Sequence, residues 1–206
     1  MSDNSTKKVL LMIADISGYT EFMVASELEI THSQYIISEL IQAIIQQVEI
    51  PLEVSKLEGD AIFLYAVKES DVYRWQDVTS KIGAKLLLFF DAFHEKLTAL
   101  GIHGSCECGA CSNAGALRLK IVVHSGKALF YTIHEFNELS GGDVILVHRL
   151  LKNSATRDEY ILMTEPAYSD LEFPEQLQVE EGRESYEHLG EIKTLLYYPR
   201  MQQAAG

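Results

Sequence analysis

VLLMIADISGYTEF, residues 9–22, joins an apolar run to a carboxylate, a turn and the start of a helix. The six residues Val9–Ala14 are all apolar, a pattern typical of a short strand buried on both faces. Asp15 follows directly, Ser17-Gly18 suits a tight turn, and the Thr-Glu pair beyond it can open a helix. A carboxylate at such a turn either caps the helix or helps to hold a hard cation and its phosphates. This stretch alone favours the cap.

A second stretch, residues 52–67, changes that balance with the sequence LEVSKLEGDAIFLYAV. Two strand-like runs flank the tripeptide Glu-Gly-Asp, and a Gly-Asp connection between apolar runs predicts a hairpin with Asp60 at its tip. If the hairpin pairs beside the first strand, Asp15 and Asp60 converge. Two converging carboxylates repel each other unless a cation lies between them, so the two stretches together predict a metal site.

The length and charge of the chain exclude several classes of function. Its 206 residues suit one domain, residues 1–206, that can bury a sizeable core without disulfides. The polar residues 1–6 are expected to be disordered. The net charge of −13 argues against nucleic acid and anionic membrane partners, because both require a basic surface. The apolar runs are too short for a membrane span or a signal peptide, so we expect a cytoplasmic protein.

The periodicity of the apolar residues predicts the class of fold. A helical period runs through residues 29–48 and 71–100, and two glycines precede a shorter helical segment at 143–152. Further strand-like runs cover residues 117–124, 128–133, 160–163 and 194–198. This order predicts an α+β sandwich in which helices cover one face of a mostly antiparallel sheet.

Three sequence blocks carry a resemblance to a known family. They are ADISGYTEF (14–22), KLEGDAIF (56–63) and GGDVILVHRLL (141–151). In order and spacing they resemble the three signature blocks of class III adenylate/guanylate cyclases, and the likeness extends from about Lys8 to Tyr198. The resemblance implies a ferredoxin-like core with the site at one end of the sheet. It also implies a homodimer that binds a nucleoside triphosphate with Mg²⁺ or Mn²⁺ and forms a cyclic nucleotide for signal transduction.

The resemblance assigns roles to particular residues. It implies that metal is held by Asp15, Asp60 and the backbone carbonyl of Ile16. Lys56 falls where these cyclases place a lysine that reads the purine edge across the dimer interface; a solvated strand lysine is the alternative. The second purine-reading residue falls near Glu138.

The third block departs from the family pattern. Class III cyclases carry an asparagine that orients the ribose, about four residues before a catalytic arginine that stabilises charge on the phosphate. Arg149 is present, but the asparagine position is Ile145. Loss of one positioned donor lowers a rate by about 10²–10³. The sequence therefore leaves two alternatives, a cyclase and a catalytically degenerate module with a regulatory or ligand-sensing role. His124 and His148 are expected to be core histidines, with replacement of the missing group as the alternative.

A loop at residues 102–116 contains every cysteine of the chain and is expected to be an insert in the common cyclase pattern. Three thiolates and an imidazole can close a tetrahedral zinc site. The spacing is tighter than the two separated ligand pairs of structural zinc sites, which favours a loop of reduced thiols. Together with the sequence HRLLKN (148–153), the loop resembles an uncharacterised bacterial cyclase-like subgroup with a CxCxxC loop. The residues concerned are His103, Cys106, Cys108 and Cys111.

Overall fold

The central element of the fold is the first strand, β1 (Ser5–Ser17), in a computed structural model that describes residues 5–25, 29–102 and 108–199. It pairs antiparallel with β3 (Ala61–Val67) on one side and with β4 (Arg118–Ile133) on the other. Residues 9–14 are 0–1% exposed, and they alternate between two hydrophobic cores. The prediction of a strand buried on both faces is confirmed.

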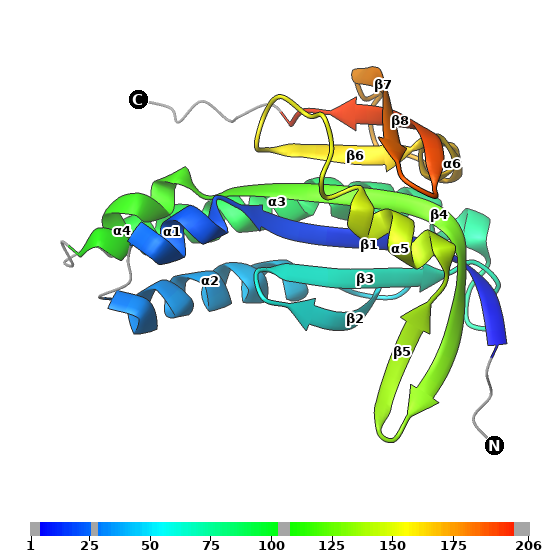
Figure 1. Ribbon diagram of the computed structural model, residues 1–206, viewed down its shortest axis with the longest axis horizontal. Helices are drawn as coiled ribbons and strands as arrows, with labels where there is room; N and C mark the ends of the chain where they lie inside the picture. Colours follow the sequence, from blue (N-terminus) through cyan, green and yellow to red (C-terminus); the bar gives the residue numbers. More distant parts are fainter. Residues whose placement is uncertain (1–4, 26–28, 103–107, 200–206) are drawn as a thin grey trace.

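The sheet extends from β1 in both directions in the order β2-β3-β1-β4-β6-β8-β7, and β5 pairs with β4 outside this path (Figure 1). Every neighbouring pair is antiparallel except β4 and β6, which are parallel. The predicted mostly antiparallel sheet is therefore confirmed. The remaining strands are β2 (Glu53–Glu58), β5 (Phe136–Ser140), β6 (Tyr160–Thr164), β7 (Val179–Tyr186) and β8 (Gly190–Tyr197).

Two long helices cover one face of the sheet, as the sequence predicts. They are α2 (Ile30–Ile45) and α3 (Thr79–Ile102), whose apolar stripes join the larger core. The short helix α5 (Gly142–Arg149) packs against the opposite face and contributes to the second core, so this face is not bare. The other helical segments are α1 (Tyr19–Ala25), α4 (Gly109–Asn113), α6 (Glu165–Asp170) and the 3-10 turns η2 (Trp75–Asp77) and η3 (Ala114–Ala116).

One end of the molecule holds the elements around Asp15 and around the described cysteines. The last residues of β1, the helices α1 and α4 and the start of α2 all lie at the end drawn on the left in Figure 1.

Two predictions need correction here. Ser5 and Thr6 are not disordered, because they pair with β4, and part of the predicted loop at 102–116 is helical. Among the described helices, none has the length and apolar character needed to cross a bilayer.

Candidate functional site

The structure brings together the two aspartates that the sequence singled out. The register of β1 and β3 pairs Asp15 with Ala61, which places Asp60 beside the end of β1. Gly59 adopts φ +70° and allows the tight turn between β2 and β3, a conformation that favours glycine. The backbone N–H of Ile16 donates to the carbonyl oxygen of Asp60 over 3.3 Å, and the two carboxylates lie close enough for the charge of Asp15 to raise the pKa of Asp60. The predicted convergence is present.

Burial and like charge make this pair electrostatically unfavourable. Burial, followed by the charge of Asp15, raises the pKa of Asp60 to about 6. The compensating cation is Lys120, whose Nζ lies 2.8 Å from Oδ2 of Asp15. Burial acts to lower the pKa of Lys120, but the hydrogen bond and the charge of Asp15 outweigh it, and the pKa is raised. One ammonium group therefore serves two carboxylates.

Lys120 did not emerge from the sequence reasoning. Its strand, LRLKIVVH, was recognised, but only the β1–β4 register shows that Lys120 stands opposite Asp15. The ammonium demonstrates that a cation fits against the pair. Carboxylate and carbonyl oxygens are the ligands that Mg²⁺ and Mn²⁺ prefer, so the residues present fit such an ion. A divalent cation requires ionised Asp60 and competes with Lys120 for Asp15.

A second group of predicted residues meets on β2 and β5. Nζ of Lys56 lies 3.0 Å from Oε2 of Glu138 and 3.7 Å from Oε1 of Glu58. The hydrogen bond to Glu138 raises the pKa of Lys56. The two residues that the resemblance assigns to the purine therefore touch each other, although 82 positions separate them in the sequence. They offer a donor and an acceptor side by side.

Helix α5 presents the remaining predicted residues to solvent. Ile145 and Arg149 are one turn apart, while Val144 and Val147 enter the second core. Ile145 is 54% exposed. Within the described part of the chain, the Arg149 side chain makes no ion pair or side-chain hydrogen bond, so its guanidinium can meet a ligand or another chain.

His148 joins α5 to the charged group on β2. Its Nδ1 lies 2.7 Å from the carbonyl oxygen of Val144, and its Nε2 lies 3.1 Å from Oε2 of Glu58. Because Glu58 also contacts Lys56, the four side chains of His148, Glu58, Lys56 and Glu138 form one continuous polar network. We call this network, with Ile145 and Arg149, the base half of the site, after the purine base that the resemblance assigns to Lys56 and Glu138. We call Asp15, Asp60 and Lys120 the metal half.

His124 is a core histidine, as expected. It is 6% exposed, and burial lowers its pKa. Its two ring nitrogens lie 2.9 Å from Oγ1 of Thr164 and 3.2 Å from Oδ1 of Asp143. These partners fix the ring between β4, β6 and α5, and His124 is not a replacement for a missing site residue.

The structure describes two of the four residues in the zinc hypothesis, Cys108 and Cys111, and adds a third candidate ligand. His103 and Cys106 lie outside the described residues. Cys108 and Cys111 gather around His32 of α2, a residue that sequence reasoning missed. No local spacing could reveal His32, because 76 positions separate it from Cys108.

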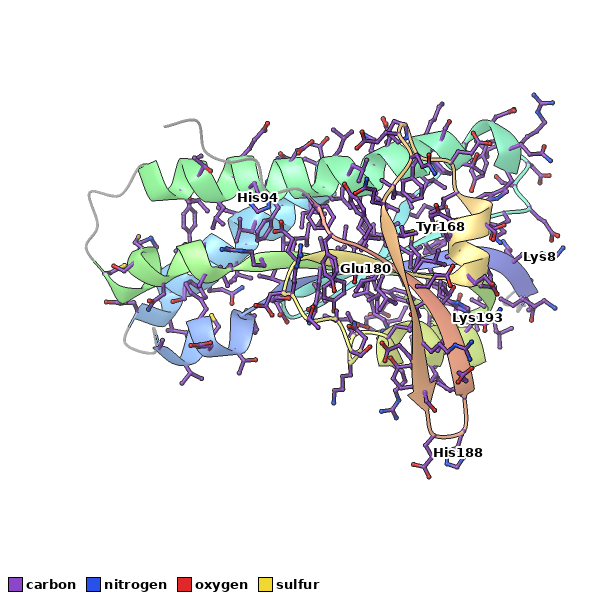
Figure 2. The ribbon with its side chains drawn as sticks, turned by 90° about the horizontal axis from the view of Figure 1, so that it is seen from above. Lys8, His94, Tyr168, Glu180, His188 and Lys193 are labelled. Atoms are coloured by element: carbon purple, nitrogen blue, oxygen red, sulfur yellow. The ribbon has the colours of Figure 1, made fainter. Side chains whose placement is uncertain are left out.

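A surface cavity of about 670 Å³ lies away from both halves of the site. It is bounded by α6, β7 and β8, with Tyr168 and Lys193 in its wall (Figure 2). Figure 1 shows α6 at the other end of the sheet from α1. None of the predicted site residues lines this cavity.

Sequence comparison assigns the chain to a family without a known function. The model of the family described as "Protein of unknown function (DUF2652)" matches residues 37–160, more than half of the chain. The chain belongs to the DUF2652 family. An uncharacterized protein of Mycobacterium tuberculosis, Rv2561/Rv2562, is 27% identical to this DUF2652 chain over 157 residues, which is 76% of this chain and 70% of that protein.

Solved structures similar to this DUF2652 protein include guanylyl and adenylyl cyclases and a cyclase-like protein. The guanylyl cyclase Cya2 superposes with a TM-score of 0.69 and 12% identity over 98% of each chain. The adenylyl cyclase CyaB of Pseudomonas aeruginosa gives 0.68 and 14%, over 97% of this chain and 98% of that one. A class III adenylyl cyclase-like ATP-binding protein of P. aeruginosa gives 0.61 and 15%, over 81% of this chain and 35% of that one.

These likenesses establish the fold of the chain. At such low identity they show a cyclase-like fold, and the predicted fold class is confirmed. Membership of a CxCxxC subgroup stays a prediction, because the matched family is described without it.

Proposed function

We propose that two copies of this DUF2652 chain bind a nucleoside triphosphate together with Mg²⁺ or Mn²⁺ between them. The observation that carries the proposal is the convergence of Asp15 and Asp60 at one end of a cyclase-like sheet. One neighbour with this fold is named an ATP-binding protein, and another is a guanylyl cyclase, which supports a nucleotide as the ligand class.

The metal half supplies oxygen ligands for the ion and the positive charge of Lys120. Carboxylate oxygens of Asp15 and Asp60, with the Ile16 carbonyl, would hold the ion, which when bound neutralises phosphate charge and favours attack by the ribose hydroxyl. In the absence of the ion, the ammonium group of Lys120 offsets part of the repulsion between the carboxylates of Asp15 and Asp60. Release of Lys120 from Asp15 frees an ammonium group beside the phosphates.

The base half supplies recognition. Lys56 and Glu138 place a donor beside an acceptor, which is the chemistry needed to distinguish one purine edge from another. Arg149 provides a planar guanidinium suited to bidentate contact with phosphate. In the proposed dimer these groups of one copy face Asp15 and Asp60 of the other.

Exposed apolar side chains on neighbouring elements support the dimer. Leu57 on β2, Phe136 on β5 and Ile145 on α5 are 54%, 61% and 54% exposed. The Lys56–Glu138 and His148–Glu58 contacts hold these three elements together. A second copy that covers them removes apolar surface from water.

Ile145 favours a second function, a degenerate module that binds nucleotide for regulation without turning it over. An isoleucine cannot donate to the ribose or hold its hydroxyl in line. The exposed position of Ile145 on the same helix face as Arg149 supports its location at the ligand. Slow turnover or none is then the expected behaviour, with binding retained.

A thermal-shift experiment with product analysis tests both functions. We expect ATP or GTP with Mn²⁺ to raise the melting temperature, and Asp60→Asn to abolish the Mn²⁺ effect. Asp91→Asn, which removes the same charge from the exposed side of α3, should respond as the wild type does. Absence of any nucleotide or Mn²⁺ response in the wild type contradicts the proposal. Cyclic product in the incubation mixture favours the cyclase, and binding without product favours the module.

A further inference from the structure

We propose that His32, Cys108 and Cys111 form a zinc site that is separate from the carboxylate pair. One ligand atom from each of the three residues can be chosen so that all lie within 4.8 Å of one another. All three side chains are partly buried. They come from two places in the chain, α2 and the start of α4, so their meeting is a product of the tertiary fold.

The nitrogen–sulfur distances within the cluster lie close to those between ligands that share a zinc ion. Zn–S bonds of about 2.3 Å and Zn–N bonds of about 2.0–2.1 Å at tetrahedral angles place the ligand atoms about 3.6–3.8 Å apart. Nε2 of His32 lies 3.8 Å from Sγ of Cys111, and Nδ1 lies 3.2 Å from Sγ of Cys108. These distances involve different ring nitrogens, but one choice of nitrogen lies within 4.8 Å of both sulfurs, so rotation of the imidazole can direct that nitrogen toward a centre shared with them.

The chemistry of the donor set selects the metal. Two thiolates and an imidazole are the ligands of structural zinc, whereas Mg²⁺ and Mn²⁺ prefer oxygen. The spacing of Cys108 and Cys111 is C-x2-C, the turn spacing common in zinc sites. The backbone N–H of Cys111 donates to Sγ of Cys108 over 3.5 Å, a contact that orients the sulfur.

Contacts around the cluster indicate what the metal stabilises. The carboxylate of Glu29, next to α2, accepts a hydrogen bond from the backbone N–H of Ala110 over 3.1 Å. Helix α4 packs against both α1 and α2. A zinc ion on His32 and the two cysteines adds a cross-link to these contacts and fastens the connection between α3 and β4 to the helix layer. Because the three ligands join α2 to α4, we assign the ion a structural role.

Metal analysis of the full chain tests the site directly. Protein expressed with supplemented zinc should contain about one zinc ion per chain, and the chelated protein should regain it. Titration of the chelated wild type with Co²⁺ should produce the thiolate-to-cobalt charge-transfer and visible bands of cobalt bound by cysteine thiolates. A folded wild-type protein that takes up neither Zn²⁺ nor Co²⁺ overturns the proposal, and this measurement does not depend on any variant folding.

Variants identify the ligands. His32→Asn and Cys111→Ser should each weaken zinc affinity by about 100-fold or more, because even outer partners of a ligand contribute about 10–100-fold. His188→Asn is the matched control; this histidine lies at the tip of the β7–β8 hairpin with its side chain 88% exposed (Figure 2). Unchanged affinity in His32→Asn contradicts the assignment.

Asp60→Asn separates this site from the proposed nucleotide site. This variant should keep its zinc although it loses the Mn²⁺ response. Loss of zinc in Asp60→Asn places the ion at the carboxylates and overturns the proposal. A protein that binds zinc here but never responds to nucleotide leaves the zinc site standing and removes only the nucleotide function.

Discussion

The metal half and the base half of the candidate site differ in how firmly the fold holds them. Asp15 and Lys120 lie on the adjacent strands β1 and β4, Asp60 lies in the turn directly before β3, and the strand register fixes their separation; the side chains of Lys120 and Asp15 are only 21% and 14% exposed. The base half lies at the edge of the sheet and on the solvent side of α5, where Lys56 is 39% exposed and Ile145 54%. Residues within a strand register are costly to change, whereas peripheral residues can drift while the fold survives. The contrast is consistent with the sequence resemblance to class III cyclases, which includes both aspartates of the metal half but has an isoleucine, Ile145, in the base half where those cyclases have an asparagine.

The largest effect is expected when the asparagine missing from the base half is introduced. Ile145→Asn should leave nucleotide affinity nearly unchanged and raise cyclase turnover by up to about 10²-fold, because the donor acts mainly in the transition state. Product formation at saturating nucleotide measures it. Val72→Asn, a change at another exposed apolar residue, serves as the control. Two inactive proteins that both bind Mn²⁺ and nucleotide would show that more than the asparagine is missing.

The next largest effect concerns the cation in the metal half. Lys120→Met leaves the two carboxylates without a cationic partner. In the metal-free protein we expect the free energy of unfolding to fall by about 2 kcal/mol, which lowers the melting temperature by about 4–8 °C. Mn²⁺ should restore more stability to this variant than it adds to the wild type, since no ammonium competes for Asp15. Lys127→Met, on the same strand but exposed, should change little. Equal Mn²⁺ responses in wild type and variant would show that the ion does not compete with Lys120 for Asp15.

A moderate effect is expected from the purine-reading pair. Lys56→Met should lower nucleotide affinity by about tenfold, or about 1.4 kcal/mol, and reduce the discrimination between ATP and GTP. Melting temperature should change little, because both side chains of the ion pair keep about a third of their surface in water, which screens the charges. Lys193→Met removes an exposed lysine–glutamate pair elsewhere and should leave nucleotide affinity intact. If Lys193→Met weakens nucleotide binding as much as Lys56→Met does, Lys56 has no specific role in binding.

The smallest effect is the pH dependence of Asp60. Its pKa of about 6 in the fold exceeds the ordinary value of 3.8, so the folded state binds the proton more tightly than the unfolded state. The penalty of ionising Asp60 is therefore absent below about pH 4, develops as the pH rises through 6, and is complete above it. With solvent screening at this half-buried group, Asp60→Asn should stabilise the metal-free protein by about 1 kcal/mol, or about 2–4 °C, at pH 7.5. Melting curves from pH 4 to 8 check this, and an advantage that shrinks with rising pH would contradict it.

Sequence reasoning located those parts of the fold and site that have a local signature. The apolar run of β1, the Gly-Asp turn and the order of strands and helices each follow from a short window, and they sufficed to bring Asp15 and Asp60 together. Lys120 needed a strand register, and His32 needed the packing of α4 on α2. Neither relation is encoded within a short window. The same limit explains the β-structure of Ser5 and Thr6, where pairing with β4 overrides a polar composition.

The central position of β1 has a consequence for the order in which the chain folds. Its partner β4 begins about 100 residues after β1 ends, which corresponds to about 5–20 s of synthesis at about 5–20 residues per second. During that interval β1 has at most the β2–β3 hairpin beside it, and one edge of a strand whose residues 9–14 are all apolar stays unpaired. Such an edge is a template for pairing with other chains. We therefore expect the nascent protein to need protection by a chaperone until β4 has emerged, and fragments that end before β4 to aggregate.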